Sequence, residues 1–209
     1  MTKAKIPSRT IERLVLYQRL MAELLAKGRS TFFSHQLALL AHSNPAQVRR
    51  DLMSIGQSGG PRRGYETEDT LKRITSLLTG SKERRLALVG VGNLGRAILS
   101  YFAYRHPGLT IVAAFDSDPA KADRVISGCR CYGIHDFTDK ATELEATIGI
   151  ITVPGAHAQQ VADLMVASGM KGILNFAPVP LKVPEGIHTD RIDIASSLEK
   201  LAYFADRAE

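Results

Sequence analysis

The most constraining feature of this sequence is a short apolar segment that runs directly into three closely spaced glycines. Residues 86–90 have the composition of a buried strand, and a helical segment follows over residues 96–104. Between them, Gly90 permits a tight turn, Gly92 leaves room for a diphosphate against the backbone, and Gly95 lets the helix pack closely on the strand. The pattern predicts a phosphate-binding turn at a helix N-terminus, formed by Gly90, Val91, Gly92, Asn93, Leu94 and Gly95.

A carboxylate stands where a dinucleotide-binding fold needs one. The strand candidate over residues 110–115 ends in Asp116, which follows Gly95 by 21 residues, the spacing at which an acidic side chain contacts the adenosine ribose. Asp118 adds a second negative charge with no adjacent arginine, so a 2′-phosphate is disfavoured and NAD(H) is preferred over NADP(H). The alternative is that both carboxylates only form a turn before Pro119.

The rest of this half alternates between strand and helix candidates. Strands are expected over residues 148–153, 172–176 and 191–194, and a helix over residues 156–168. Such alternation predicts a doubly wound parallel sheet, the Rossmann architecture, which binds ligands at the carboxyl ends of its strands. Unless they serve only as turns, the loops at these ends offer candidate contacts on the nicotinamide side through Thr152, Val153, Pro154, Asn175 and Pro178.

The positive charge of the chain lies in its first part. Residues 1–80 contain 13 Lys and Arg against 6 Asp and Glu, whereas residues 81–209 contain 14 against 15. A basic excess in a small domain is typical of a nucleic-acid partner, although a solvated helical surface gives the same count. We therefore expect a DNA-binding domain over residues 1–80, a dinucleotide-binding domain over residues 81–195 and a separate helix within residues 196–209.

The first part is expected to be helical. Apolar residues recur at helical spacing over residues 8–27, and a short helix capped by Ser34 follows, with Leu37 and Leu40 as its apolar stripe. The segment Asn44-Pro45-Ala46-Gln47 then supplies a cap, a proline at the first helical position and a glutamine typical of a capping box. Short helices joined by a tight turn predict a helix-turn-helix.

The third helix, expected over residues 45–55, has an apolar side formed by Val48, Leu52 and Ile55. The opposite side carries amide and guanidinium groups, which can bond adenine or guanine edges in a major groove. The candidate DNA contacts on this helix are Gln47, Arg49, Arg50 and Ser54. Asp51 is predicted to share that side, where it either orients an arginine or indicates an ordinary polar surface.

A glycine-rich basic loop over residues 58–65 predicts a β-hairpin wing, with a solvated loop as the alternative. Arg62 and Arg63 at its tip are candidates for contact with phosphates or a narrow minor groove. A further helix, capped by Thr67 and bearing a leucine and isoleucine stripe, is expected before a polar linker over residues 79–85. The first part therefore has the expected order of a winged helix-turn-helix domain.

Cysteine usage and the N-terminal sequence bear on the compartment. Cys129 and Cys131 are the only cysteines, too few for a zinc site or a disulfide framework, and we expect reduced thiols and no metal site. The first residues are polar and basic without a following apolar run, so neither a signal peptide nor a membrane span is predicted. These features favour a cytoplasmic protein.

Several motifs together resemble the Rex family of redox-sensing repressors, and the likeness extends over nearly the whole chain. The motifs are Ile6-Pro7, Gln47-Val48-Arg49-Arg50-Asp51-Leu52, Gly64-Tyr65, Gly90-Val91-Gly92-Asn93-Leu94-Gly95-Arg96-Ala97, Ala113-Ala114-Phe115-Asp116, Thr152-Val153-Pro154 and Lys171-Gly172-Ile173-Leu174-Asn175-Phe176-Ala177-Pro178. The resemblance implies a homodimer, not an enzyme, that binds a palindromic operator in double-stranded DNA when NADH is scarce and releases it when NADH accumulates. NAD(H) is then a sensed ligand and not a turned-over cofactor.

The resemblance also implies a switch. Tyr101 matches a family tyrosine near the nicotinamide, Asp193 matches an aspartate that contacts this tyrosine across the dimer, and Arg19 matches its arginine partner. The helix expected over residues 196–207 resembles a swapped arm between the partner's domains, although its apolar stripe would as readily pack on its own subunit. Departures from the family pattern at Met53-Ser54-Ile55-Gly56 and Pro61-Arg62-Arg63-Gly64 leave the operator preference open.

Two other functions compete with this interpretation. A small NAD-dependent dehydrogenase needs an acid or base beside the nicotinamide, and His157, which follows Pro154, is the best candidate. However, only about 130 residues follow Gly80, which leaves little chain for a separate substrate domain. A winged-helix regulator that binds another nucleotide is the third possibility.

Overall fold

The computed structural model describes residues 6–60, 63–79, 83–103 and 108–207. The chain divides into two compact units, Met1–Lys82 and Glu83–Glu209, each held together by contacts among its own residues. Within the described residues, no helix combines the length and the apolarity needed to cross a membrane.

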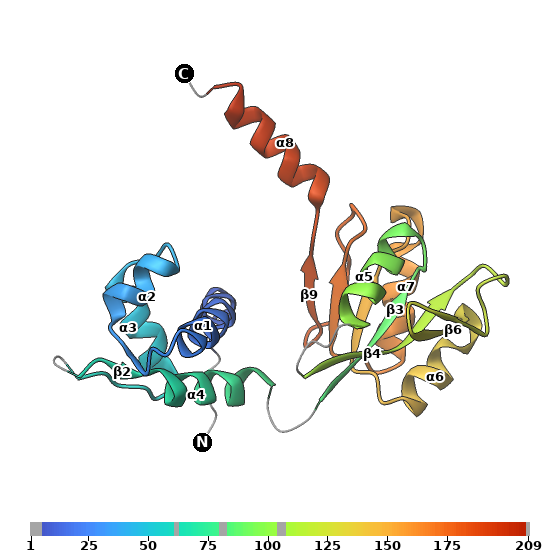
Figure 1. The fold of residues 1–209 in the computed structure, drawn as a ribbon. Helices are drawn as coiled ribbons and strands as arrows, with labels where there is room; N and C mark the ends of the chain where they lie inside the picture. The colour runs from blue at the N-terminus through green and yellow to red at the C-terminus, as the bar shows by residue number, and fades with distance from the viewer. Residues whose placement is uncertain (1–5, 61–62, 80–82, 104–107, 208–209) are drawn as a thin grey trace. The chain divides into compact units, whose positions relative to one another are not determined.

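The N-terminal unit is a helical domain with a small two-stranded sheet (Figure 1). Its elements are α1 (Ser8–Ala26), β1 (Thr31–Phe32), α2 (Ser34–Leu40), α3 (Pro45–Ser54), β2 (Tyr65–Glu66) and α4 (Thr67–Thr79). Their apolar faces meet in one core around Leu14, Tyr17, Met21, Leu37 and Leu52. This order of elements is the winged helix-turn-helix predicted from the sequence.

The described part of the predicted wing is its base, which adjoins the small sheet of β1 and β2. Phe32 and Tyr65 pair across β1 and β2, and their rings stack at 5.3 Å between centroids. Gly60 and Gly64 close the loop through reciprocal backbone hydrogen bonds of 3.2 and 3.0 Å. Gly64 has a φ of +67°, which disfavours any side chain there.

Three local predictions in this unit are wrong. Ser34 is the first residue inside α2 and makes no capping bond; the Gln36 side chain instead accepts from the Phe33 N–H at 2.9 Å. Thr67 opens α4, but its hydroxyl is buried without a partner among the described residues. Leu40, expected in the core, is 46% exposed, and Ala38 takes the buried position beside Leu37.

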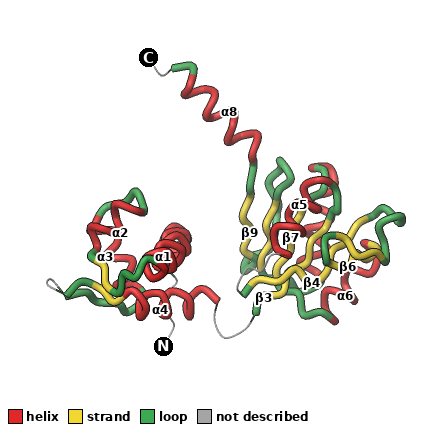
Figure 2. The backbone as a smooth tube through the Cα atoms, viewed as in Figure 1, coloured by secondary structure: helices red, strands yellow, loops and turns green. Residues whose placement is uncertain are grey.

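The C-terminal unit is built on a seven-stranded sheet (Figure 2). The chain order is β3 (Arg84–Val89), α5 (Asn93–Ala103), β4 (Leu109–Asp116), β5 (Arg124–Ile126), β6 (Cys129–Gly133), a 3-10 turn (Ile134–Asp136), α6 (Phe137–Glu143), β7 (Ile148–Ile151), α7 (Gly155–Ala167), β8 (Gly172–Asn175), β9 (His188–Arg191) and α8 (Ile194–Ala205). The strand order is β5-β6-β4-β3-β7-β8-β9, and only β5 runs antiparallel to its neighbour. Because β4 and β7 flank β3 on opposite sides, the chain reverses direction across the sheet beside β3, where such folds bind ligands.

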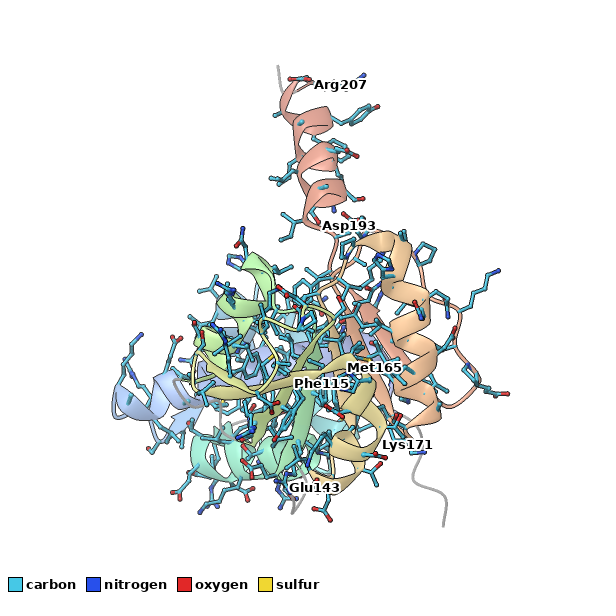
Figure 3. The ribbon with its side chains drawn as sticks, turned by 90° about the vertical axis from the view of Figure 1, so that its right-hand side faces the viewer. Phe115, Glu143, Met165, Lys171, Asp193 and Arg207 are labelled. Carbon is cyan, nitrogen blue, oxygen red and sulfur yellow. The ribbon has the colours of Figure 1, made fainter. Side chains whose placement is uncertain are left out.

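Side chains alternate between the two faces of this sheet, as period-two strands require. On β3, Ala87 and Val89 join a core with Phe115 and α7, whereas Leu86 and Leu88 join a second core against α5. Figure 3 places Phe115 and Met165 together inside the first core. The sheet is therefore covered on both faces, as predicted for a doubly wound fold.

The sequence prediction missed β5, β6 and α6 and misplaced the last strand. The strand expected over residues 191–194 ends at Arg191, and Ile194 already begins α8. None of the α8 residues is buried in the chain, and Leu198, Leu201 and Phe204 are 60%, 61% and 61% exposed. Figure 3 shows the side chains of α8 projecting from the helix between Asp193 and Arg207.

Candidate functional site

A pocket of about 760 Å³ opens at the carboxyl ends of β3, β4 and β7. Its walls come from the three loops after these strands, from Ile134 after β6, and from one face of α7. The residues that line it are Val89, Gly90, Gly92, Asp116, Ser117, Lys121, Ile134, Thr152, Val153, Pro154, His157, Gln160, Val161, Asp163, Leu164 and Ala167. Its volume is in the range typical of sites for cofactors and other small molecules.

The three glycines of the first loop have the separate roles that their spacing predicts. Gly90 has a φ of +100°, and a Cβ there would lie 2.7 Å from the Thr152 carbonyl oxygen. A Cβ on Gly95 would collide with the carbonyl oxygen of Gly90, so this glycine allows α5 to approach β3. A Cβ on Gly92 would meet no atom within 4 Å. The space above Gly92 is therefore open for a ligand at the N-terminus of α5.

Asp116, at the end of β4, is fixed by donors on both oxygens. Its Oδ2 accepts from the Val91 N–H at 2.7 Å and from Lys121 Nζ at 2.9 Å, and its Oδ1 accepts from the Asp118 N–H at 2.9 Å. Burial alone would raise the pKa of Asp116, but the Asp118 N–H, the Lys121 ammonium and the Val91 N–H together hold that pKa below its usual value. The carboxylate is therefore ionised and oriented at the pocket wall.

Lys121 is a charged pocket residue that the sequence interpretation missed. Its ammonium lies 2.9 Å from Asp116 and 3.8 Å from Asp118. The sequence interpretation considered only arginine as a cation that could neutralise a 2′-phosphate, whereas the structure places the Lys121 ammonium beside Asp116. A signal was available: in a turn that returns to the end of its strand, a lysine five residues after the strand's last carboxylate can reach back to it.

The loop after β7 lies beside Asp116 and not apart from it. Thr152, Val153 and Pro154 line the same pocket as Asp116, and the Thr152 hydroxyl donates to the Gly90 carbonyl oxygen at 2.7 Å. Because β7 lies on the side of β3 opposite β4, the predicted placement of these three residues on the nicotinamide side stays a prediction. His157 lines the same pocket.

The other predicted cofactor residues do not line the pocket. Val91, Asn93 and Leu94 continue the glycine turn into α5. Asn175 is buried, and its side chain is used by its own loop: Oδ1 accepts from the Ala177 N–H at 2.9 Å, and Nδ2 donates to the Val179 carbonyl at 2.8 Å. Pro178 is exposed in that loop.

The predicted recognition helix begins as the sequence indicates. The Asn44 side chain accepts from the Gln47 N–H at 2.8 Å, and Pro45 occupies the first turn. The capping-box role of Gln47 is wrong, because its amide nitrogen donates instead to Asp51 at 2.8 Å. The exposed residues of the predicted contact set are Arg49, Arg50 and Ser54, with Gln47 half-buried beside them.

Asp51 corrects the sequence interpretation of this helix. It is only 2% exposed and therefore does not lie on the open polar side of α3. Its carboxylate forms a two-pronged ion pair with Arg13 of α1, at 2.6 and 2.7 Å, and accepts from the Tyr17 hydroxyl at 3.1 Å. The face of α3 that carries Asp51 is covered by α1.

Of the two wing arginines, Arg63 is exposed and Arg62 lies outside the described residues. The three residues matched to the family switch occupy different elements. Arg19 is exposed on α1, and Tyr101 is 62% exposed on α5. Asp193 caps α8 by accepting from the Ser196 N–H at 3.0 Å, and the backbone and hydroxyl donors of Ser196 lower the pKa of its carboxyl.

Both cysteines lie buried on β6 as free thiols. Burial, aided by Cys131, raises the pKa of Cys129 to about 11. Among the described residues, no group of three or more His, Cys, Asp and Glu side chains is placed to hold a metal ion.

In comparison with known proteins, separate families match the two parts of the chain. A family described as CoA binding domain matches residues 81–179, and one described as putative DNA-binding protein N-terminus matches residues 5–52. The redox-sensing transcriptional repressor Rex of Rhodopirellula baltica is 37% identical over 96% of this chain and 85% of its own length. The protein of the same name from Syntrophobacter fumaroxidans is 38% identical over 96% of both chains.

Solved structures match nearly the whole chain. A crystal structure of RSP in complex with β-NAD+ and operator DNA has a TM-score of 0.91 at 28% identity, and covers 98% of this chain and 94% of its own. A structure of RSP in complex with β-NADH has a TM-score of 0.84 at 29% identity, with 97% and 95% of the two chains covered.

Proposed function

Because the chain belongs to the Rex family of redox-sensing transcriptional repressors, we propose that it binds operator DNA through its N-terminal unit and senses NADH through its C-terminal unit. NAD(H) is a sensed ligand here, and NADH binding releases the DNA. The RSP structures, one with β-NAD+ and operator DNA and one with β-NADH, support this assignment. Like its relatives, the protein is a repressor and not an enzyme.

The observation that carries the proposal is the pocket of the C-terminal unit. We place the pyrophosphate over Gly92 at the N-terminus of α5, where backbone N–H groups and the helix dipole favour negative charge. Asp116 accepts a ribose hydroxyl, and the adenine lies against the apolar side chains of Ile134, Val153 and Leu164. We place the nicotinamide toward Tyr101 of α5, the residue that matches the family tyrosine near this group.

For the N-terminal unit we propose that α3 enters the major groove. Gln47, Arg50 and Ser54 face the base edges, and Arg49 contacts the flanking backbone. The wing supplies Arg62 and Arg63 to phosphates or to the minor groove. Because a repressor must reach its operator DNA, we propose that the protein works in the cytoplasm.

We further propose a homodimer formed through α8. The exposed apolar residues of this helix, Leu198, Leu201 and Phe204, need a cover in solution, and a partner's chain supplies one. Arg19, Tyr101 and Asp193 then form the switch across the dimer, a charge-assisted network that the nicotinamide breaks or restores. Two copies related by a two-fold axis bind a palindromic operator.

The test uses sheared genomic DNA captured on the purified full chain and eluted with NADH at fixed salt, with NAD+ as competitor. Discrete palindromic fragments eluted by NADH support the proposal. DNA that is retained but ignores NADH contradicts the switch through Arg19, Tyr101 and Asp193. If no DNA is retained, the repressor function itself fails, and turnover of NADH becomes the next assay.

A further inference from the structure

We propose that Asp51 is a positioning residue for base recognition: it fixes the side chain of Gln47, and through it that of Arg50, on the DNA-facing side of α3. The inference rests on the proposed function, because it requires α3 to contact operator bases. It assigns a role to a buried residue that the DNA itself does not touch. The basis is a continuous chain of hydrogen bonds from α1 to the surface of α3.

The first part of this chain locks the carboxylate of Asp51. Its Oδ1 accepts from Arg13 Nη2 at 2.7 Å and from Gln47 Nε2 at 2.8 Å. Its Oδ2 accepts from Arg13 Nε at 2.6 Å and from the Tyr17 hydroxyl at 3.1 Å. An ionised carboxylate has about four lone-pair sites, and all are used within the protein. Asp51 therefore has no capacity left for a base and can act only through its neighbours.

The second part of the chain orients the glutamine. Gln47 Nε2 donates to Asp51, and Gln47 Oε1 accepts from Arg50 Nη2 at 2.7 Å. An amide can be rotated by 180° with little change in shape, but here a carboxylate on one side and a guanidinium on the other permit only one orientation. One N–H and one lone pair of the amide remain free, which is the pair of groups that a bidentate contact to adenine uses.

The anchor of the chain is α1. Arg13 and Tyr17 are four residues apart and therefore lie on the same face of that helix. Burial and the neighbouring carboxylate raise the pKa of Tyr17 to about 12, so its hydroxyl remains a donor at neutral pH. Because α1 holds Asp51 from two positions, the orientation of Gln47 is set before DNA arrives, and less side-chain entropy is lost on binding.

A purely structural role for Asp51 makes a different prediction. If the ion pair with Arg13 only joins α1 to α3, losing it lowers affinity for every DNA sequence in the same proportion. If it orients Gln47, the loss is confined to the operator position that Gln47 contacts. Base preference, and not total affinity, separates the two.

The experiment is selection from a half-site library randomised at each position, with the full-length wild type, Asp51→Asn, Gln47→Ala and the double variant. Each good bidentate contact discriminates against the wrong base by roughly tenfold. We expect Gln47→Ala to abolish a preference of this size at one position, Asp51→Asn to abolish most of the same preference, and the double variant to lose nothing further. Glu68→Gln is the matched control, because it makes the same carboxylate-to-amide change at an exposed ion pair on α4.

Folding of each variant is checked by thermal melting. If Asp51→Asn does not fold, Tyr17→Phe replaces it in the selection. That variant removes one donor to Asp51 and keeps the charge, so a smaller loss of the same preference is expected. A uniform loss across all positions, or additive effects of Asp51→Asn and Gln47→Ala, would overturn the inference while leaving the repressor function intact. A wild type without any base preference overturns the proposed function, and this inference with it.

Discussion

Replacing Gly92 with alanine separates ligand binding from folding. In the structure, the added Cβ meets no atom within 4 Å, and Gly92 is not among the glycines with positive φ. The free energy of unfolding should therefore change by less than about 1 kcal/mol. The same methyl group stands in the space proposed for the pyrophosphate, so we expect NADH affinity to fall by about 10–100-fold, or roughly 1.4–2.8 kcal/mol.

Gly95→Ala is the matched control, because it adds the same methyl group three residues beyond the open site. Its Cβ would collide with the backbone oxygen of Gly90 and lie 3.2 Å from the Thr152 hydroxyl. Backbone atoms in a strand-to-helix turn cannot move aside easily, so this variant should lose about 1–3 kcal/mol of stability. Gly92→Ala should therefore weaken NADH binding alone, whereas Gly95→Ala should lower the free energy of unfolding.

The measurements are titration calorimetry with NADH and urea unfolding without ligand. The chain contains no tryptophan, so unfolding is best followed by far-ultraviolet circular dichroism. If Gly92→Ala binds NADH as tightly as the wild type, the diphosphate does not lie over this turn. If Gly92→Ala instead loses as much stability as Gly95→Ala, the space above Gly92 is not open, and the added Cβ contacts the protein.

Four further predictions follow from single residues. Asp116→Ala should weaken NADH binding about tenfold and strengthen NADPH binding, because Lys121 loses the nearer of its two carboxylate partners; unchanged NADPH affinity in calorimetry contradicts this. Leu201→Asp should convert the dimer to a monomer in analytical ultracentrifugation, since it puts a charge on the apolar face of α8; a dimer that persists removes α8 from the interface. Burial raises the pKa of Cys129 to about 11, so a thiol reagent at pH 7 should modify it far more slowly in the native than in the unfolded chain, and equal rates would refute its burial. Burial would raise the pKa of Asp51, but its donors hold that pKa below the ordinary value of 3.8, so its stabilisation is present above that pH and lost on further acidification. Asp51→Asn should therefore cost about 2–3 kcal/mol in urea unfolding at pH 7 and progressively less below about pH 4; a constant difference contradicts it.

Elements set by local chemistry were predictable. The glycine turn, the Asn44 cap with Pro45 behind it, and the strand that ends in Asp116 each depend on residues close in sequence. Period-two strands and period-3.6 helices then supplied the order of the larger elements. The short β5 was missed because it has only three residues at the edge of the sheet, two of them exposed, and β6 was missed because its sequence Cys129-Arg130-Cys131-Tyr132-Gly133 contains no apolar run.

Features that depend on the arrangement of elements were not predictable. The periodicity of α3 places Asp51 beside Gln47, but only the packing of α1 shows that this side is covered. Likewise, the sequence does not state that β4 and β7 flank β3, so only the fold shows that Thr152 and Asp116 line one pocket. Lys121 was overlooked because its contact with Asp116 forms only when the intervening turn folds back.

Asp51 and Asp116 show how similar environments give one residue type two functions. Each carboxylate is buried, accepts from several donors and pairs with a cation, Arg13 in one unit and Lys121 in the other. The donors on Asp51 use both lone pairs of each oxygen, whereas Oδ1 of Asp116 has only the Asp118 N–H and retains a lone pair at the pocket wall. Asp116 can therefore bond a ribose hydroxyl directly, while Asp51 can only orient the groups beside it. The unused acceptor site, more than burial or charge, decides which of the two contacts a ligand.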